Sequence, residues 1–167
     1  MTVNKRTLSL LVDNTPGLLS RVSGLFTRRG YNIVSITAGV TTDPAYTRIT
    51  IVTEGDEDII EQIVKQLRKL VDVIDIKVLD DASSVTRELI MVKVRVEESQ
   101  RQGVISMADV FRGSIVDVGT DSLIIEMTGK QDKLDAFIRL LEGYEILELA
   151  RTGITGLSRG SDDVRYL

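Results

Sequence analysis

The 167-residue chain is long enough for one domain or two small ones, and its 43% hydrophobic content suffices for a packed core. A net charge of −4 argues against a surface that binds nucleic acids or anionic membranes in general. No basic stretch followed by an apolar run opens the sequence, and no apolar run approaches the ~20 residues of a membrane span. We therefore expect a soluble, cytoplasmic protein whose partners include neither nucleic acid nor membrane.

Cysteine and histidine are both absent from the sequence. Their absence removes the commonest nucleophiles, general bases and transition-metal ligands, and leaves carboxylates, lysines, hydroxyls and amides. A carboxylate cluster at Glu54, Asp56, Glu57 and Asp58 could serve a small carboxylate-driven enzyme. At the expected start of a helix, however, such a cluster is typical of charges that complement the helix dipole. We predict that the chain is not an enzyme by itself and binds no metal.

Hydrophobic periodicity predicts four strands and two helices in the first half of the chain. Apolar residues alternate over 5–13, as in a strand with one buried face, and then recur at helical spacing. The expected elements, in chain order, are a strand at 5–13, a helix at 16–29, strands at 31–42 and 46–54, a helix at 55–70 and a strand at 71–79. This is the split βαβ order of ferredoxin-like folds.

The second half of the chain repeats this order without repeating the sequence. Polar residues at 80–84 are typical of a linker, which places a domain boundary between residues 82 and 83. The linker is followed by strands at 88–96, 114–118, 123–128 and 144–149, by a weak helical pattern that ends at Gly113, and by a helix at 130–141. We therefore predict an α+β protein of two ferredoxin-like βαββαβ domains, 1–82 and 83–167.

The turn between the first strand and the first helix is the most informative stretch, Asp13-Asn14-Thr15-Pro16-Gly17. Thr15 suits the N-cap of the helix, and Pro16 suits its first position. A helix that opens directly off a strand presents free N–H groups, and Gly17 would let a small carboxylate approach them. The same residues also fit an ordinary turn in which Asn14 only caps backbone through an Asx-type hydrogen bond.

Several long motifs, in the same order along the chain, resemble one known family. They are DNTPGLLSRVSGLFTRRGYNIVSI from Asp13 onward, GDEDIIEQIVKQLRKLVDVIDI at 55–76, RELIMVKV at 87–94, VFRGSIVDV at 110–118, KLDAFIRLL at 133–141 and TGITGLSRG at 152–160. The first motif resembles the start of an ACT domain. Together the motifs resemble the small regulatory subunit of acetolactate synthase (acetohydroxyacid synthase), and the resemblance covers nearly the whole chain.

The resemblance implies a homodimeric subunit that binds the catalytic large subunit and raises its activity. It also implies feedback inhibition by a branched-chain amino acid, chiefly valine, bound between two ACT domains. Thiamine diphosphate, Mg and FAD would belong to the catalytic subunit, so no cofactor is expected in this chain. The residues assigned to the effector site are Asp13, Asn14, Thr15, Pro16, Gly17, Leu18, Leu19, Asn32, Ile33 and Val34.

Two other functions stay open. The chain could be a stand-alone amino-acid-binding ACT regulator of another enzyme. It could also be an RNA-binding ferredoxin-like module, although the strand sequences LIMVKVRV and ITIVTE lack the aromatic residues on which such modules stack bases. Residues 151–167 have no apolar period and predict a mobile tail, or a segment that docks on a partner. We assign the second domain to support of the dimer and, with this tail, to partner contact.

Overall fold

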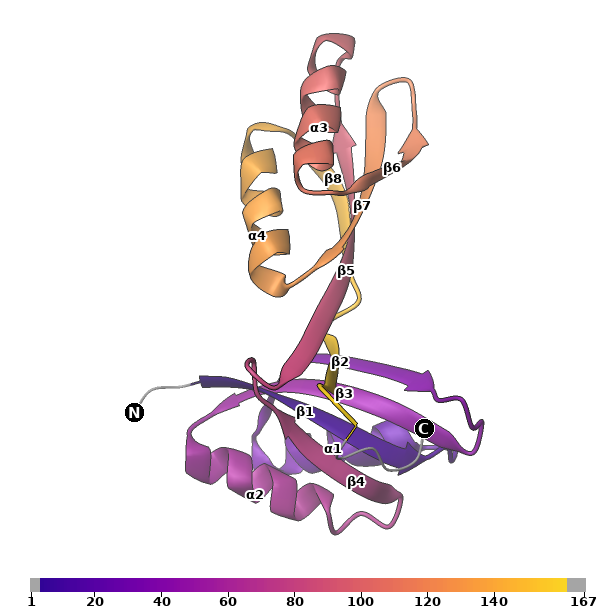
Figure 1. The fold of residues 1–167 in the computed structure, drawn as a ribbon, viewed down its shortest axis with the longest axis vertical. Helices are drawn as coiled ribbons and strands as arrows, with labels where there is room; N and C mark the ends of the chain where they lie inside the picture. The colour runs from indigo at the N-terminus through magenta and orange to yellow at the C-terminus, as the bar shows by residue number, and fades with distance from the viewer. Residues whose placement is uncertain (1–3, 162–167) are drawn as a thin grey trace. The chain divides into compact units, whose positions relative to one another are not determined.

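The computed structural model describes residues 4–161, which form two compact units (Figure 1). Unit 1 comprises the chain up to Val85 together with the segment from Ile154 onward, and unit 2 comprises Thr86–Gly153. The sequence predicted a boundary between residues 82 and 83, and it gave no sign that the chain returns to the first unit. The end of the predicted tail, residues 162–167, lies outside the described residues.

Unit 1 contains a four-stranded antiparallel sheet with two helices on one face. Its elements are β1 (Asn4–Asp13), α1 (Leu18–Arg29), β2 (Asn32–Val40), β3 (Tyr46–Gly55), α2 (Glu57–Leu67) and β4 (Val73–Leu79). The strand order is β2-β3-β1-β4, so β1 and β3 are central and β2 and β4 lie at the edges. This is the ferredoxin-like order that the sequence predicted.

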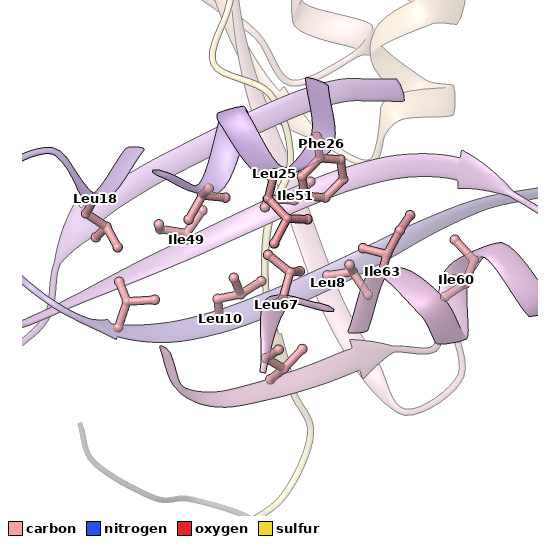
Figure 2. Packing of buried hydrophobic residues seen from close by; sticks show 13 residues of the cluster. Leu8, Leu10, Leu18, Leu25, Phe26, Ile49, Ile51, Ile60, Ile63 and Leu67 are labelled. Atoms are coloured by element: carbon pink, nitrogen blue, oxygen red, sulfur yellow. The ribbon is translucent and has the colours of Figure 1, made fainter. Parts of the chain in front are cut away.

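The core of unit 1 lies between this sheet and the helices (Figure 2). Alternate residues of β1 face the helices, because side chains point to opposite faces of a strand. From α1 the core receives residues three or four positions apart, as the helical period requires. The buried cluster consists of Leu8, Leu10, Val12, Leu18, Val22, Leu25, Phe26, Ile49, Ile51, Ile60, Ile63, Leu67 and Ile76.

The helices of unit 1 end where local chemistry predicts. Gly30 ends α1 with φ 69°, and the N–H of Tyr31 donates to the carbonyl oxygen of Phe26 at 3.0 Å, as in a Schellman motif. At the start of α2 the Asp56 carboxylate accepts the N–H of Ile59 at 2.9 Å. The predicted closure of the first helix by Gly30 is therefore confirmed.

Unit 2 repeats the same plan. Its elements are β5 (Ser84–Arg95), which begins in unit 1, α3 (Glu98–Val110), β6 (Ser114–Val118), β7 (Ser122–Gly129), α4 (Gln131–Leu140), the 3-10 turn η1 (Leu141–Gly143) and β8 (Ile146–Arg151). The strand order is β6-β7-β5-β8. A capping box between Glu97 and Gln100 begins α3, whose apolar period is the weakest in the sequence. The predicted α+β class with two ferredoxin-like units is confirmed.

The last strand, β9 (Thr155–Ser158), belongs to unit 1 and lies within the stretch for which the sequence predicted a mobile tail. It pairs with β5 and contacts β4. The N–H of Arg159 donates to the carbonyl oxygen of Ser83 at 2.8 Å. Among residues 4–161, no helix is long and apolar enough to cross a membrane.

Candidate functional site: the turn between β1 and α1

The turn between β1 and α1 is a type II β-turn. Gly17 has φ 78° and ψ 4°, the values of the third position of that turn, and Pro16 suits the second position. The N–H of Leu18 donates to the carbonyl oxygen of Thr15 at 3.4 Å. Since glycine adopts a positive φ without steric cost, the backbone itself requires Gly17 here.

The first helix starts later than the sequence predicted. It begins at Leu18 instead of residue 16, and Gly17 precedes it without any side-chain cap. The prediction that Thr15 caps this helix was wrong, because its hydroxyl donates to the Asp72 carboxylate at 2.9 Å. Pro16 and Gly17 form the turn ahead of the helix, so Thr15 lies too far upstream to reach the first helical N–H groups.

Thr15, Arg21 and Asp72 form a polar network against the turn. The Arg21 guanidinium donates from Nε to Asp72 Oδ2 at 2.8 Å, from Nη2 to Thr15 Oγ1 at 3.0 Å, and from Nη1 to the carbonyl oxygen of Pro16 at 3.2 Å. Asp72 is buried, and its backbone carbonyl accepts the N–H of Asp13 at 2.8 Å. Hydrogen bonds from Arg21 and Thr15 hold the pKa of the Asp72 carboxyl below its ordinary value. The ionised carboxylate is therefore paired and fixes the turn to the end of β1.

Asn14 ties the turn to the loop between β2 and β3. Its N–H donates to the carbonyl oxygen of Ala45 at 2.8 Å, and its side-chain Nδ2 donates to that of Pro44 at 3.0 Å. The side chain therefore bonds across the fold and does not form the Asx-type cap that the sequence left open. Its Oδ1 accepts none of the hydrogen bonds found among residues 4–161, and Asn14 is exposed.

Among residues 4–161, the backbone N–H groups at the start of α1 have no internal acceptor. The first bond of the helix runs from the N–H of Arg21 to the carbonyl oxygen of Gly17 at 3.0 Å, so the N–H groups of Leu19 and Ser20 precede it. Gly17, Leu19 and Ser20 are all exposed. These N–H groups lie at the positive end of the helix dipole, which is suited to a small carboxylate.

The apolar residues of the predicted site differ in exposure. Leu18 is only 5% exposed and packs in the core of unit 1 (Figure 2), so its side chain offers no surface to a ligand. Leu19 is 50% exposed and Val34 is 38% exposed. Ile33 is partly buried against the core. Leu19 and Val34 are therefore the apolar side chains of this set that remain open to solvent.

The structure does not bring the turn and the start of β2 together within one chain. In the sheet Asp13 pairs with Tyr46, whereas Asn32 pairs with Glu54, eight residues further along β3. At ~3.3 Å per residue the two ends are about 26 Å apart. One copy of the chain therefore holds two separate parts of the predicted site, one at the turn and one at the start of β2.

The carboxylate cluster at residues 54–58 has structural partners instead of an arrangement for catalysis. Asp56 caps α2, and Glu57 forms an ion pair with Arg6. Within the described part of the chain, no group of three or more acidic residues could hold a metal ion. We therefore assign no chemistry to this cluster.

Sequence reasoning missed Arg21 and Asp72. The two residues are far apart in the sequence, and they meet because β4 pairs beside β1. The only sequence signal for Arg21 is its position one helical turn after Gly17, where its side chain can reach back to the turn. Asp72 gives no signal, because a lone aspartate before a strand is common.

Comparisons with known proteins identify the family of the chain. The AHAS small subunit-like ACT domain family matches residues 8–75, and the family described as small subunit of acetolactate synthase matches residues 87–160. The acetolactate synthase small subunit of Mycolicibacterium smegmatis is 47% identical over 154 residues, which are 92% of this chain and 91% of that protein. The acetolactate synthase isozyme 3 small subunit of Salmonella typhimurium is 46% identical over 162 residues, which are 96% and 99% of the two chains.

A solved structure extends this likeness to the fold. The crystal structure of the acetolactate synthase small subunit from Thermotoga maritima has a TM-score of 0.88 and 41% sequence identity. The match covers 95% of this chain and 99% of that one. With relatives of this identity along almost its whole length, the chain belongs to the family of acetolactate synthase small, regulatory subunits, and unit 1 contains its ACT domain.

Proposed function

We propose that this chain binds the catalytic large subunit of acetolactate synthase, raises its activity, and confers feedback inhibition by valine. Thiamine diphosphate, Mg and FAD would be held by the large subunit, as membership of the small-subunit family implies. Family membership supports the partner. The observation that supports a bound effector is the turn, where α1 begins with an exposed glycine and with N–H groups that have no acceptor among the described residues.

The effector site uses the turn for the polar groups of the amino acid. Its α-carboxylate accepts hydrogen bonds from the N–H groups of Gly17, Leu19 and Ser20, aided by the helix dipole. Its α-amino group donates to Oδ1 of Asn14, which has no donor within the described residues. Its side chain contacts Leu19 and, from a second copy, Val34.

The second copy pairs along β2. Among the described residues β2 pairs only with β3, so its outer edge keeps unpaired backbone groups, and Val34, Ile36 and Val40 are exposed. In an antiparallel pair of β2 strands, the start of one strand lies beside the end of the other. The end of β2 is the end of the sheet at which the turn lies, since Val40 pairs with Thr47 next to the Asp13 position. A symmetric dimer would thus supply Asn32 and Val34 to the partner's turn.

Purification with a catalytic subunit, followed by activity assays with each branched-chain amino acid, tests the function. We expect the chain to raise the activity and valine to lower it again. Leucine should act more weakly without being excluded, because one methylene discriminates by only ~1–3 kcal/mol. Activation itself should survive changes at Asn14 and Asn32, since it need not use the effector site. A chain that leaves the activity unchanged would contradict the proposal.

The dimer is tested by Val34→Lys, since a lysine on an edge strand opposes pairing. We expect light scattering to show a monomer and calorimetry to show lost valine binding. The matched control is Val110→Lys at the last residue of α3, where the side chain is 79% exposed and a positive charge suits the helix end. The control should leave mass and binding unchanged. A stable monomer of the parent chain that binds valine with full affinity would contradict the shared site.

A further inference from the structure

The face of the unit 1 sheet opposite the helices is buried. Ser9 and Leu11 alternate with the core residues of β1 and therefore point away from α1 and α2. Both are nonetheless buried, and so are Thr50 and Val52, which lie on the same face of β3. Something other than the helices therefore covers this face of the sheet.

The segment that follows Gly153 lies on this face. Thr37 of β2 is the cross-strand partner of Thr50, and its hydroxyl donates to the carbonyl oxygen of Ile154 at 3.1 Å. Figure 1 shows β9, in yellow, against the strands of unit 1. The N–H of Arg159 donates to Ser83 at 2.8 Å and fixes the other end of the segment.

Glycines flank the segment and allow the chain to turn at both ends. Gly153 has φ 84° and Gly160 has φ 76°, in the left-handed region that favours glycine. Between them Gly156 is buried, whereas Leu157 is 59% exposed. The glycine-rich motif at 152–160 thereby acquires a structural role, since Gly153 allows the chain to turn onto the sheet.

We propose that residues 154–159 are a strap that docks in cis on this face of the sheet and holds β2 in place. Within the described residues β2 pairs only with β3, so the bond from Thr37 to Ile154 is an attachment independent of the β2–β3 pairing. Because β2 also carries Asn32 and Val34, the strap supports the effector site, a consequence that rests on the proposed function.

The docking is tested first without any ligand. The chain has no cysteine, so Leu157→Cys gives a single site for a nitroxide label. We expect the label to broaden the amide signals of Thr37 and Thr50 in the same molecule. In a mixture of nitroxide-labelled chain with isotope-labelled, nitroxide-free chain, both carrying Val34→Lys so that paired β2 strands do not bring the label near the other copy, those signals should stay sharp. Absence of broadening within one molecule, or broadening caused by another copy, would overturn docking in cis.

The attachment to β2 is tested by Thr37→Val, which keeps the shape of the side chain and removes its hydroxyl. Loss of one hydrogen bond should lower the exchange protection of the Arg159 amide roughly tenfold and raise the Kd for valine roughly two- to tenfold. The control is Thr27→Val, because the Thr27 hydroxyl donates to the carbonyl oxygen of Ser23 in its own helix. Equal protection and equal Kd in the two variants would overturn the strap. A parent chain that binds no valine would overturn the proposed function alone, since the protection of Arg159 still tests the strap.

Discussion

Gly17→Ala perturbs the turn on which the proposed effector site depends. The φ of 78° lies in the left-handed region, which costs an L residue about 1–2 kcal/mol. The added Cβ would lie 3.2 Å from Nη1 of Arg21, the far end of a long side chain that can move aside. We therefore expect the free energy of unfolding of unit 1 to fall by about 1–2 kcal/mol while the fold survives.

The same change should affect valine binding more strongly than stability. In the proposed site a methyl group at residue 17 would occupy the space over the N–H groups that receive the carboxylate. Displacing a charged acceptor from such donors should raise the Kd for valine roughly tenfold or more. An aspartate at this position would add a negative charge that repels the carboxylate, so a small neutral side chain is the cleaner test of obstruction.

Two variants separate backbone strain from obstruction. Gly24→Ala lies in the same helix, no atom lies within 4 Å of its added Cβ, and it should stabilise unit 1 by about 1 kcal/mol. Gly17→Asn should lose less stability than Gly17→Ala, because asparagine adopts the left-handed region more readily. It should nonetheless lose valine binding, because its side chain also covers the N–H groups.

Hydrogen exchange at the amides of Val22, Leu25 and Phe26 measures the free energy of unfolding of unit 1 separately from that of unit 2. That choice matters because a chain of two units need not unfold in one transition. A loss of about 1–2 kcal/mol in the free energy of unfolding lowers the exchange protection of these amides roughly 5- to 30-fold. Equal protection and equal valine affinity in Gly17→Ala and Gly24→Ala would refute the reasoning.

Two other changes test the network at the turn and the core of unit 2. Hydrogen bonds from Arg21 and Thr15 lower the pKa of Asp72 in the folded chain. The stability that Asp72 contributes is therefore fully present at a pH above its ordinary pKa of 3.8, and it is lost as the pH falls through the folded pKa. Asp72→Asn should therefore flatten the acid dependence of exchange in α1, and an unchanged acid curve would contradict this. Phe137→Ala removes a fully buried ring and should cost unit 2 about 3–5 kcal/mol without changing exchange in α1, so equal losses in both units would be the contrary result.

Most of the fold could be predicted because local periodicity and burial agree. Leu8, Leu10 and Val12 alternate in the sequence, and all three lie in the core of unit 1. Gly30 after two arginines predicted the end of α1, because a left-handed residue there depends only on its neighbours. The start of the same helix was less predictable, since Thr15 suits a cap and Pro16-Gly17 suit a turn, and the bond from Thr15 to Asp72 decided between them.

Contacts between distant segments could not be predicted from one sequence. The pairing of Arg21 with Asp72 depends on the register of β4 beside β1, which no local pattern reveals. The return of β9 to unit 1 is of the same kind, since residues 154–158 have no apolar period and receive their place from Thr37 and Ser83. A chain cut at the linker would therefore lack part of unit 1.

The separation of the two parts of the effector site explains how the proposed effector could act on an enzyme. A ligand with equal affinity for two arrangements of a protein shifts neither, so inhibition requires an arrangement that valine prefers. Within one chain the turn and Asn32 are about 26 Å apart, too far for one amino acid to bridge. A ligand that contacts both must therefore favour paired ACT domains, and at a hundredfold excess over Kd it stabilises that pairing by about 2.7 kcal/mol. In this proposal the catalytic subunit responds to the arrangement of two ACT domains, and the turn alone carries no signal.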